Sequence, residues 1–88
     1  MERYVKVYLD YFDYKVQSEV ICEACLNPAQ DVHHINGRGK GMDVIGNLIA
    51  LCRKCHERAH GTKHYVTKGD FQYIHNYFLT GKRKTFLK

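Results

Sequence analysis

The sequence predicts a small α+β fold in which a metal ion holds a two-stranded hairpin and a following helix together. Two apolar runs, residues 32–35 and 48–51, flank a segment with four glycines, as the strands of a hairpin with a long flexible loop do. Two Cys-x-x-Cys pairs, which begin at Cys22 and Cys52, bracket this hairpin. Paired cysteines at this spacing are typical of ligands to one ion. We expect flanking helices on both sides of the hairpin.

The length favours one domain over residues 1–88, with a core motif at residues 20–61, an aromatic segment at 1–19, and a helix and basic tail at 62–88. A chain of 88 residues buries little surface, and domains of this size usually add disulfides or a metal. The first residues lack the basic-then-apolar order of a secretory signal, so we expect a cytoplasmic protein. Disulfides are rare in the cytoplasm, and the cysteines are therefore expected to bind metal.

A membrane partner is not expected, because the longest apolar run covers only residues 48–52. About 20 apolar residues are needed to span a bilayer. The net charge of +5 is concentrated toward the carboxyl end: residues 1–30 carry −2, residues 31–60 carry +2 and residues 61–88 carry +5. A basic tail of this kind favours a polyanionic partner, nucleic acid before membrane.

Three helices are expected around the hairpin. Residues 4–14 fit both helical and strand periodicity, and their length of eleven residues favours a helix. Residues 52–60 contain neither Gly nor Pro, which predicts a helix that ends before Gly61. Thr67 is placed to cap a third helix together with Asp70. The buried stripe of that helix is expected to comprise Phe71, Ile74, Tyr77 and Phe78, with Gly81 at its end.

The two cysteine pairs predict one structural zinc site. Two-residue spacing lets both sulfurs of a turn face one tetrahedral ion at about 2.3 Å, so Cys22, Cys25, Cys52 and Cys55 close a four-sulfur site. Such a site has no open position for chemistry. The alternative is a redox-active dithiol, which requires a βαβ unit that the sequence does not suggest.

Four histidines form two further patterns. His33 and His34 are adjacent on the first predicted strand, and His56 and His60 lie four residues apart on the predicted helix. Residues at this helical spacing project from one face and can chelate one cation, and imidazole suits zinc, nickel or manganese. No role is predicted for His64 or His75.

These residues resemble the His-Asn-His (HNH) endonucleases. The resemblance rests on Asp31-Val32-His33-His34-Ile35, on Asn47 and on the segment from Cys52 to His60, and it covers residues 20–61. It implies a zinc-stabilised ββα-metal (His-Me finger) domain that hydrolyses phosphodiester bonds in double-stranded DNA. It also implies a source in a bacterial or phage-infected cell.

The resemblance assigns roles by position. It implies that His34 is the general base, and that His33 and His56, with His60, hold one catalytic divalent cation, which is Mg²⁺, Mn²⁺, Ni²⁺ or Zn²⁺. Asn47 is expected to tie the glycine-rich loop across the hairpin and to orient His34 through a side-chain amide contact. In some members of the family the equivalent residue binds the metal instead. Neighbouring side chains on an ideal strand point to opposite faces, so His33 and His34 can serve one phosphate only where the strand bends or ends.

Asp31 is placed to hydrogen-bond a ligand histidine and orient it. Eight basic side chains are expected to bind DNA phosphates, and such contacts carry no sequence information. These residues are Arg38, Lys40, Arg53, Lys54, Arg58, Lys82, Arg83 and Lys84. We therefore expect low sequence specificity, and because the sequence predicts a single site, we expect nicking of one strand.

Two other functions remain open. A non-catalytic, zinc-stabilised DNA-binding module would keep the cysteines and the basic tail but would have no use for His34 or Asn47. A protein-interaction knuckle that uses the aromatic start would need neither DNA affinity nor cleavage. The sequence does not indicate the oligomeric state.

Overall fold

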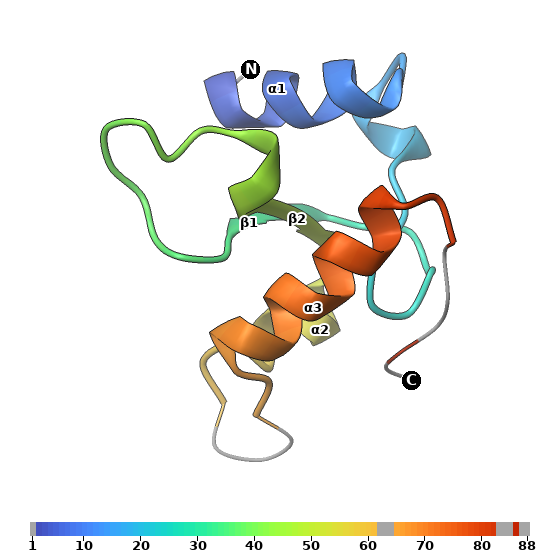
Figure 1. The fold of residues 1–88 in the computed structure, drawn as a ribbon. Helices are drawn as coiled ribbons and strands as arrows, with labels where there is room; N and C mark the ends of the chain where they lie inside the picture. The colour runs from blue at the N-terminus through green and yellow to red at the C-terminus, as the bar shows by residue number, and fades with distance from the viewer. Residues whose placement is uncertain (1, 62–64, 83–85, 87–88) are drawn as a thin grey trace.

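The computed structural model describes residues 2–61, 65–82 and 86, and its order of elements is that of an α+β fold (Figure 1). The predicted fold class is confirmed. The helices are α1 (Arg3–Phe12), α2 (Arg53–Glu57) and α3 (Lys68–Leu79), the strands are β1 (Asp31–His34) and β2 (Leu48–Leu51), and the short 3₁₀ turns are η1 (Gln17–Glu19) and η2 (Ile45–Asn47).

The predicted hairpin is formed by antiparallel pairing of β1 with β2, in a register that sets His33 opposite Ile49 and His34 opposite Leu48. The sheet lies between α1 on one face and α3 on the other (Figure 1). Every residue of β2 is buried. Leu48 and Ala50 pack with α1, whereas Ile49 and Leu51 pack with α3. Successive side chains point to opposite faces, which explains why a strand covered on both faces is apolar without interruption.

Helix α1 forms because its buried residues follow helical spacing. Val5, Tyr8 and Leu9 are buried on one side, in the i, i+3, i+4 pattern of an amphipathic helix. The helix ends at Asp13, which adopts a left-handed conformation with φ of 58°. The helical interpretation of the tyrosine-rich start is confirmed over the strand interpretation.

Helix α3 begins and ends as its sequence indicates. The Thr67 hydroxyl accepts a hydrogen bond from Asp70 N at 3.1 Å, and the Asp70 carboxylate accepts one from Thr67 N at 3.3 Å. This reciprocal capping box fixes the first turn. Phe71, Ile74 and Phe78 are buried as expected, whereas Tyr77 is only half-buried.

Helix α2 is shorter than predicted, because it spans Arg53–Glu57 rather than residues 52–60. Beyond Glu57 the backbone continues with i to i−3 hydrogen bonds from Arg58, Ala59 and His60. Such bonds tighten the end of a helix into 3₁₀ geometry. None of the described helices is long and apolar enough to cross a bilayer.

A polar network lies inside the core, where the sequence did not predict one. The Glu23 carboxylate accepts hydrogen bonds from Tyr8 Oη at 2.6 Å and from Ala50 N at 3.3 Å, and it lies 2.7 Å from His75 Nδ1. His75 Nε2 donates to the carbonyl of Ile45 at 2.6 Å. Burial raises the pKa of Glu23, and its contacts with His75 and Tyr8 act in the opposite direction. The network links α1, the first cysteine turn, α3 and η2.

Candidate functional site

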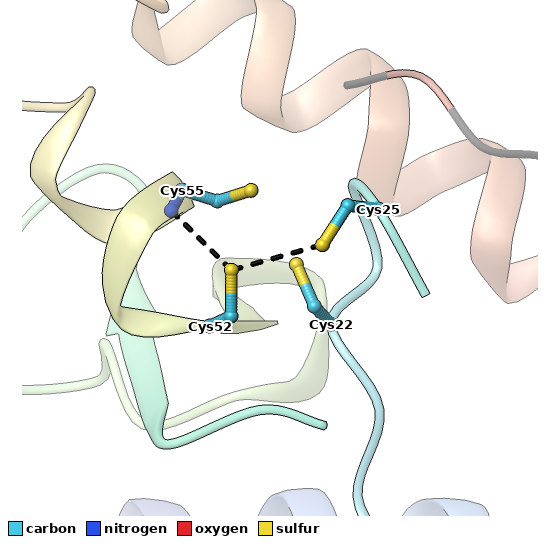
Figure 2. Close-up of side chains that lie close together, drawn as sticks. All are labelled: Cys22, Cys25, Cys52 and Cys55. Carbon is cyan, nitrogen blue, oxygen red and sulfur yellow. Dashed lines mark hydrogen bonds between the residues drawn. The ribbon is translucent and has the colours of Figure 1, made fainter. Parts of the chain in front are cut away.

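The four cysteines gather at one point, from two separate turns. All four are free thiols, and their sulfur atoms lie within 4.8 Å of one another (Figure 2). The sulfurs of Cys25 and Cys52 are 3.7 Å apart. A tetrahedron with metal–sulfur distances of about 2.3 Å has edges of roughly 3.8 Å, so this arrangement fits a zinc ion. The four cysteines are therefore positioned to hold a structural metal ion, consistent with zinc.

Backbone hydrogen bonds shape both cysteine turns. In the first turn, Leu26 N donates to the carbonyl of Cys22 at 2.8 Å, and Leu26 takes a left-handed φ of 68°. In the second turn, Cys52 is the N-cap of α2, and its sulfur accepts a hydrogen bond from Cys55 N at 3.4 Å. Each turn thus directs its two sulfurs toward the same point.

The thiols differ in how readily they lose their protons. Burial raises the pKa of Cys22 and of Cys55. Burial acts in the same direction on Cys52, but hydrogen bonds from Cys55 and the neighbouring thiols outweigh it and lower the pKa of Cys52. Because thiolates are the metal ligands, a cation that binds here must displace protons.

Three histidine rings converge on the other end of α2. The ring centroid of His33 lies 4.8 Å from that of His56 and 6.2 Å from that of His60, and the rings of His56 and His60 are 5.8 Å apart. Burial, together with the nearby rings of His56 and His60, lowers the pKa of His33 to about 4. His33 is thus a neutral imidazole at neutral pH, which is the form that binds a cation. Among the described residues, the four cysteines are the only group of three or more His, Cys, Asp or Glu whose ligand atoms all lie within 4.8 Å of one another, so the ligand nitrogens of the three histidines are spaced more widely than the sulfurs.

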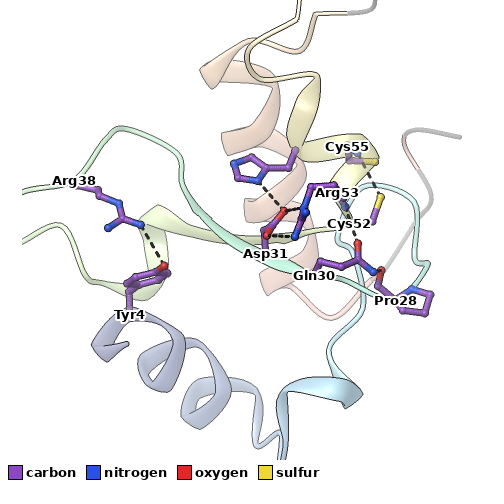
Figure 3. A network of polar contacts seen from close by, with 9 residues as sticks. Tyr4, Pro28, Gln30, Asp31, Arg38, Cys52, Arg53 and Cys55 are labelled. Atoms are coloured by element: carbon purple, nitrogen blue, oxygen red, sulfur yellow. Dashed lines mark hydrogen bonds and ion pairs between the residues drawn. The ribbon is translucent and has the colours of Figure 1, made fainter. Parts of the chain in front are cut away.

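Asp31 holds one of these rings in place. His56 Nδ1 lies 2.9 Å from the Asp31 carboxylate, which also accepts two hydrogen bonds from the Arg53 guanidinium at 3.0 and 3.3 Å (Figure 3). Burial acts to raise the pKa of Asp31, but the hydrogen bonds from His56 and Arg53 outweigh it and lower that pKa. A carboxylate accepts hydrogen bonds, so Nδ1 of His56 donates to Asp31, and in the neutral ring the lone pair for a cation is on Nε2.

His34 is the last residue of β1, and its side chain is on the opposite face from His33. Its ring is nearly buried, with its centroid 4.6 Å from that of Tyr4 in α1, and its Nε2 is 2.8 Å from the Asp43 carboxylate. Both His33 and His34 nevertheless line one cavity of about 270 Å³, together with His56, His60 and Arg38. The end of the strand at His34 therefore lets neighbouring residues from opposite faces border the same cavity.

Asn47 ties the ends of the glycine-rich loop together. Its side-chain oxygen accepts a hydrogen bond from Asn36 N at 2.8 Å, and its side-chain nitrogen donates to the carbonyls of Gly37 and Met42 at 3.2 and 3.0 Å. The expected amide contact with the His34 ring is not among these bonds, and the ring is instead paired with Asp43.

The basic side chains predicted to bind DNA lie in different surroundings. Arg38 donates to Tyr4 Oη at 3.2 Å, with its guanidinium 4.9 Å from the centre of that ring (Figure 3). Lys40, in the glycine-rich loop, lines a cavity of about 230 Å³ with Arg3 and Asp43. Arg53 pairs with Asp31 within the chain. Lys54 and Lys82 are exposed, Arg58 is half-buried, and Arg83 and Lys84 lie outside the described residues.

Sequence reasoning missed two residues beside His34. Asp43 lies in the glycine-rich loop, whose conformation the sequence does not predict. No local pattern therefore indicated that its carboxylate would face His34. Tyr4 was expected only as part of a helix, and nothing in its spacing indicated that it would cover His34. His75 could have been recognised as buried, because it continues the apolar face of α3 next to Ile74.

The arrangement agrees with a comparison with known protein families. Residues 22–62 match the family model described as HNH endonuclease, which covers 41 of the 88 residues, just under half of the chain. The matched segment contains both cysteine pairs, both strands and helix α2. None of the curated proteins or solved structures compared with the chain matches it. The HNH domain supports, in general terms, a nuclease or DNA-binding role with nucleic acid as the substrate.

Proposed function

We propose that this chain is a metal-dependent DNA endonuclease that hydrolyses phosphodiester bonds and nicks one strand of a duplex at a time with low sequence specificity. The observation that carries the proposal is the meeting of four histidines around one cavity. His33, His56 and His60 bring three imidazoles together there, and His34 lines the same cavity from the end of β1.

His33 and His56, with His60, would hold one divalent cation. Their chemistry fits such an ion, because His33 is neutral and Asp31 pairs with Nδ1 of His56, so that Nε2 is the nitrogen available to a cation. When bound, the cation would neutralise the charge that develops on the phosphate. An all-histidine set favours Zn²⁺, Ni²⁺ or Mn²⁺, and Mg²⁺ prefers oxygen ligands.

His34 would act as the general base. It takes a proton from a water molecule, and the oxygen of that water attacks the phosphorus atom in line with the leaving oxygen. The phosphorus–oxygen bond to the leaving group then breaks, and the leaving oxygen gains a proton from solvent. Histidine is the side chain that most often accepts the proton in a step of this kind.

The basic side chains would position the duplex. Arg38 borders the cavity of the histidines, and Lys40 and Lys54 are exposed on the loop and on α2. Contacts of lysine and arginine with phosphates fix the register of a duplex without reading its bases, which supports low sequence specificity. The single set of converging histidines among the described residues supports cleavage of one strand per encounter.

A supercoiled plasmid assay tests the proposal. The zinc-loaded chain is incubated with plasmid and with Mg²⁺, Mn²⁺, Ni²⁺ or additional Zn²⁺, and nicked product is separated from linear product. We expect nicked plasmid to accumulate first, only with an added cation, and not with His34→Ala. Equal behaviour of the wild type and His34→Ala would instead support a zinc-stabilised module that binds DNA without cutting it.

A further inference from the structure

The hydrogen bond between His34 and Asp43 joins the end of β1 to the glycine-rich loop. His34 Nε2 and Asp43 Oδ1 are 2.8 Å apart, and the His34 side chain is only 4% exposed. Asp43 is partly open to solvent, at 33% exposure. The hydrogen bond therefore connects the buried ring of His34 to the surface loop that borders the cavity.

This contact determines which ring nitrogen of His34 carries the proton. A carboxylate only accepts hydrogen bonds, so Nε2 of His34 must donate to Asp43. In the neutral ring the lone pair then resides on Nδ1. A base that accepts a proton from water needs a free lone pair, and Asp43 leaves Nδ1 to provide it.

Two further contacts fix the plane of the ring. The Tyr4 ring packs against it at 59°, and Arg38 holds Tyr4 through a hydrogen bond and a cation–π contact. The hydrogen bond of Nε2 with Asp43 and the packing of Tyr4 against the ring therefore restrict flipping of the His34 imidazole.

Asn47 acts on His34 through the same loop. Its side-chain nitrogen donates to the carbonyl of Met42, the residue before Asp43. Asn47 thus holds the backbone that presents the Asp43 carboxylate, and it does so without touching the His34 ring itself.

We propose that Asp43 is the positioning residue of the general base. It holds His34 in the tautomer with the proton on Nε2, so that Nδ1 takes the proton from the attacking water. This inference rests on the proposed function, in which His34 is the base.

The test compares Asp43→Ala, Asp43→Asn and the exposed control Asp13→Ala in the zinc-loaded chain. Long-range ¹⁵N–¹H spectra of the histidine rings report the tautomer without any cleavage, and loss of signals in His34→Ala assigns the ring. The kcat and KM of plasmid nicking and the melting temperature are measured on the same samples.

We expect a proton on Nε2 of His34 in the wild type and in Asp13→Ala, and a mixture of tautomers in Asp43→Ala. The kcat of Asp43→Ala should fall by roughly 10- to 100-fold with KM nearly unchanged, as for other residues that orient a catalytic group. Asp43→Asn should lie between the two, because its amide oxygen still accepts from Nε2.

Two results would overturn the role of Asp43. One is a wild type that cleaves together with an Asp43→Ala variant that has the same tautomer and kcat. The other is a loss of kcat in Asp43→Ala that follows entirely from a lowered melting temperature. A change of tautomer in Asp43→Ala, with a wild type that cuts no plasmid under any cation, would instead overturn the proposed function of His34.

Discussion

The two ends of α2 carry two clusters that differ in how they are built. At its start, Cys22, Cys25, Cys52 and Cys55 come from two tight turns, and their sulfurs already lie at distances that suit one ion. Toward its other end, His56 is half-buried, His60 is exposed just beyond the helix, and their rings meet that of His33 around a cavity. A closed site stabilises a fold, whereas an open one leaves room for a substrate. Under the proposed function, stability and chemistry are thus assigned to different clusters of the chain.

The largest effect is expected at the cysteine cluster. Cys55→Ser removes one sulfur from a buried site, and zinc binding contributes about 10–16 kcal/mol to the folding of small zinc domains. We expect Cys55→Ser to lose zinc and cooperative thermal unfolding, and we expect the same of the wild type once a chelator has removed its zinc. A Cys55→Ser protein that melts like the wild type would show that this cluster does not support the fold.

The second-largest effect is expected at the histidine cluster formed by His33, His56 and His60. A change there should affect activity without affecting folding. His56→Ala removes one imidazole and leaves the cysteine site intact, so we expect plasmid cleavage to fall by roughly a thousandfold or more with zinc content and melting temperature preserved. Glu57→Ala, at the exposed neighbouring position, is the matched control and should cleave normally. Global unfolding of His56→Ala would instead assign that histidine to the fold.

A pH series sharpens the comparison at the cysteine cluster. Burial raises the pKa of Cys22 and Cys55, so both thiols hold protons that zinc must displace. Zinc affinity should therefore rise with pH, and zinc-dependent stability should be present at pH 8 and lost as the pH falls. The expected slope is about tenfold in affinity per pH unit for each proton released. Competition with a chelator between pH 6 and 8 measures this dependence of zinc affinity on pH. A zinc affinity that does not change with pH would contradict protonated thiols.

The smallest effect is expected in the loop that joins the strands. Asn47→Ala removes three hydrogen bonds, each with a net contribution of about 1 kcal/mol, and the freed backbone groups regain water. We expect the free energy of unfolding to fall by about 2 kcal/mol, with zinc retained and cleavage reduced because Asp43 is no longer held. Asn76→Ala, at an exposed position on α3, is the control and should change neither the free energy of unfolding nor the cleavage rate. Equal urea midpoints for the two variants would show that Asn47 does not hold the loop.

The sequence predicted the parts of the molecule that depend on local pattern. The hairpin, the helical start, the capping box at Thr67 and the cysteine cluster follow from periodicity or from spacing of a few residues, and the structure confirms them. Local pattern failed at the end of α2, where 3₁₀ hydrogen bonds replace the last helical turn.

Contacts between distant segments were beyond the reach of the sequence. Asp43 contacts His34 only because the glycine-rich loop folds back on β1. Tyr4 contacts His34 only because α1 packs on the face of the sheet opposite α3. Glu23 lies inside a cysteine turn where a charged side chain would be expected at the surface, and Tyr8 and His75 bury it. These contacts depend on packing, which no short motif encodes.

Counting the bound ions tests the separation of the two clusters most directly. The zinc-loaded wild type is dialysed to equilibrium against Mn²⁺, Ni²⁺, Mg²⁺ or additional Zn²⁺, beside a variant in which His33, His56 and His60 are all replaced by Ala. We expect one tightly held zinc in both proteins and a second, exchangeable ion in the wild type alone. The same single zinc in both proteins under every cation, or loss of zinc from the variant, would contradict this expectation.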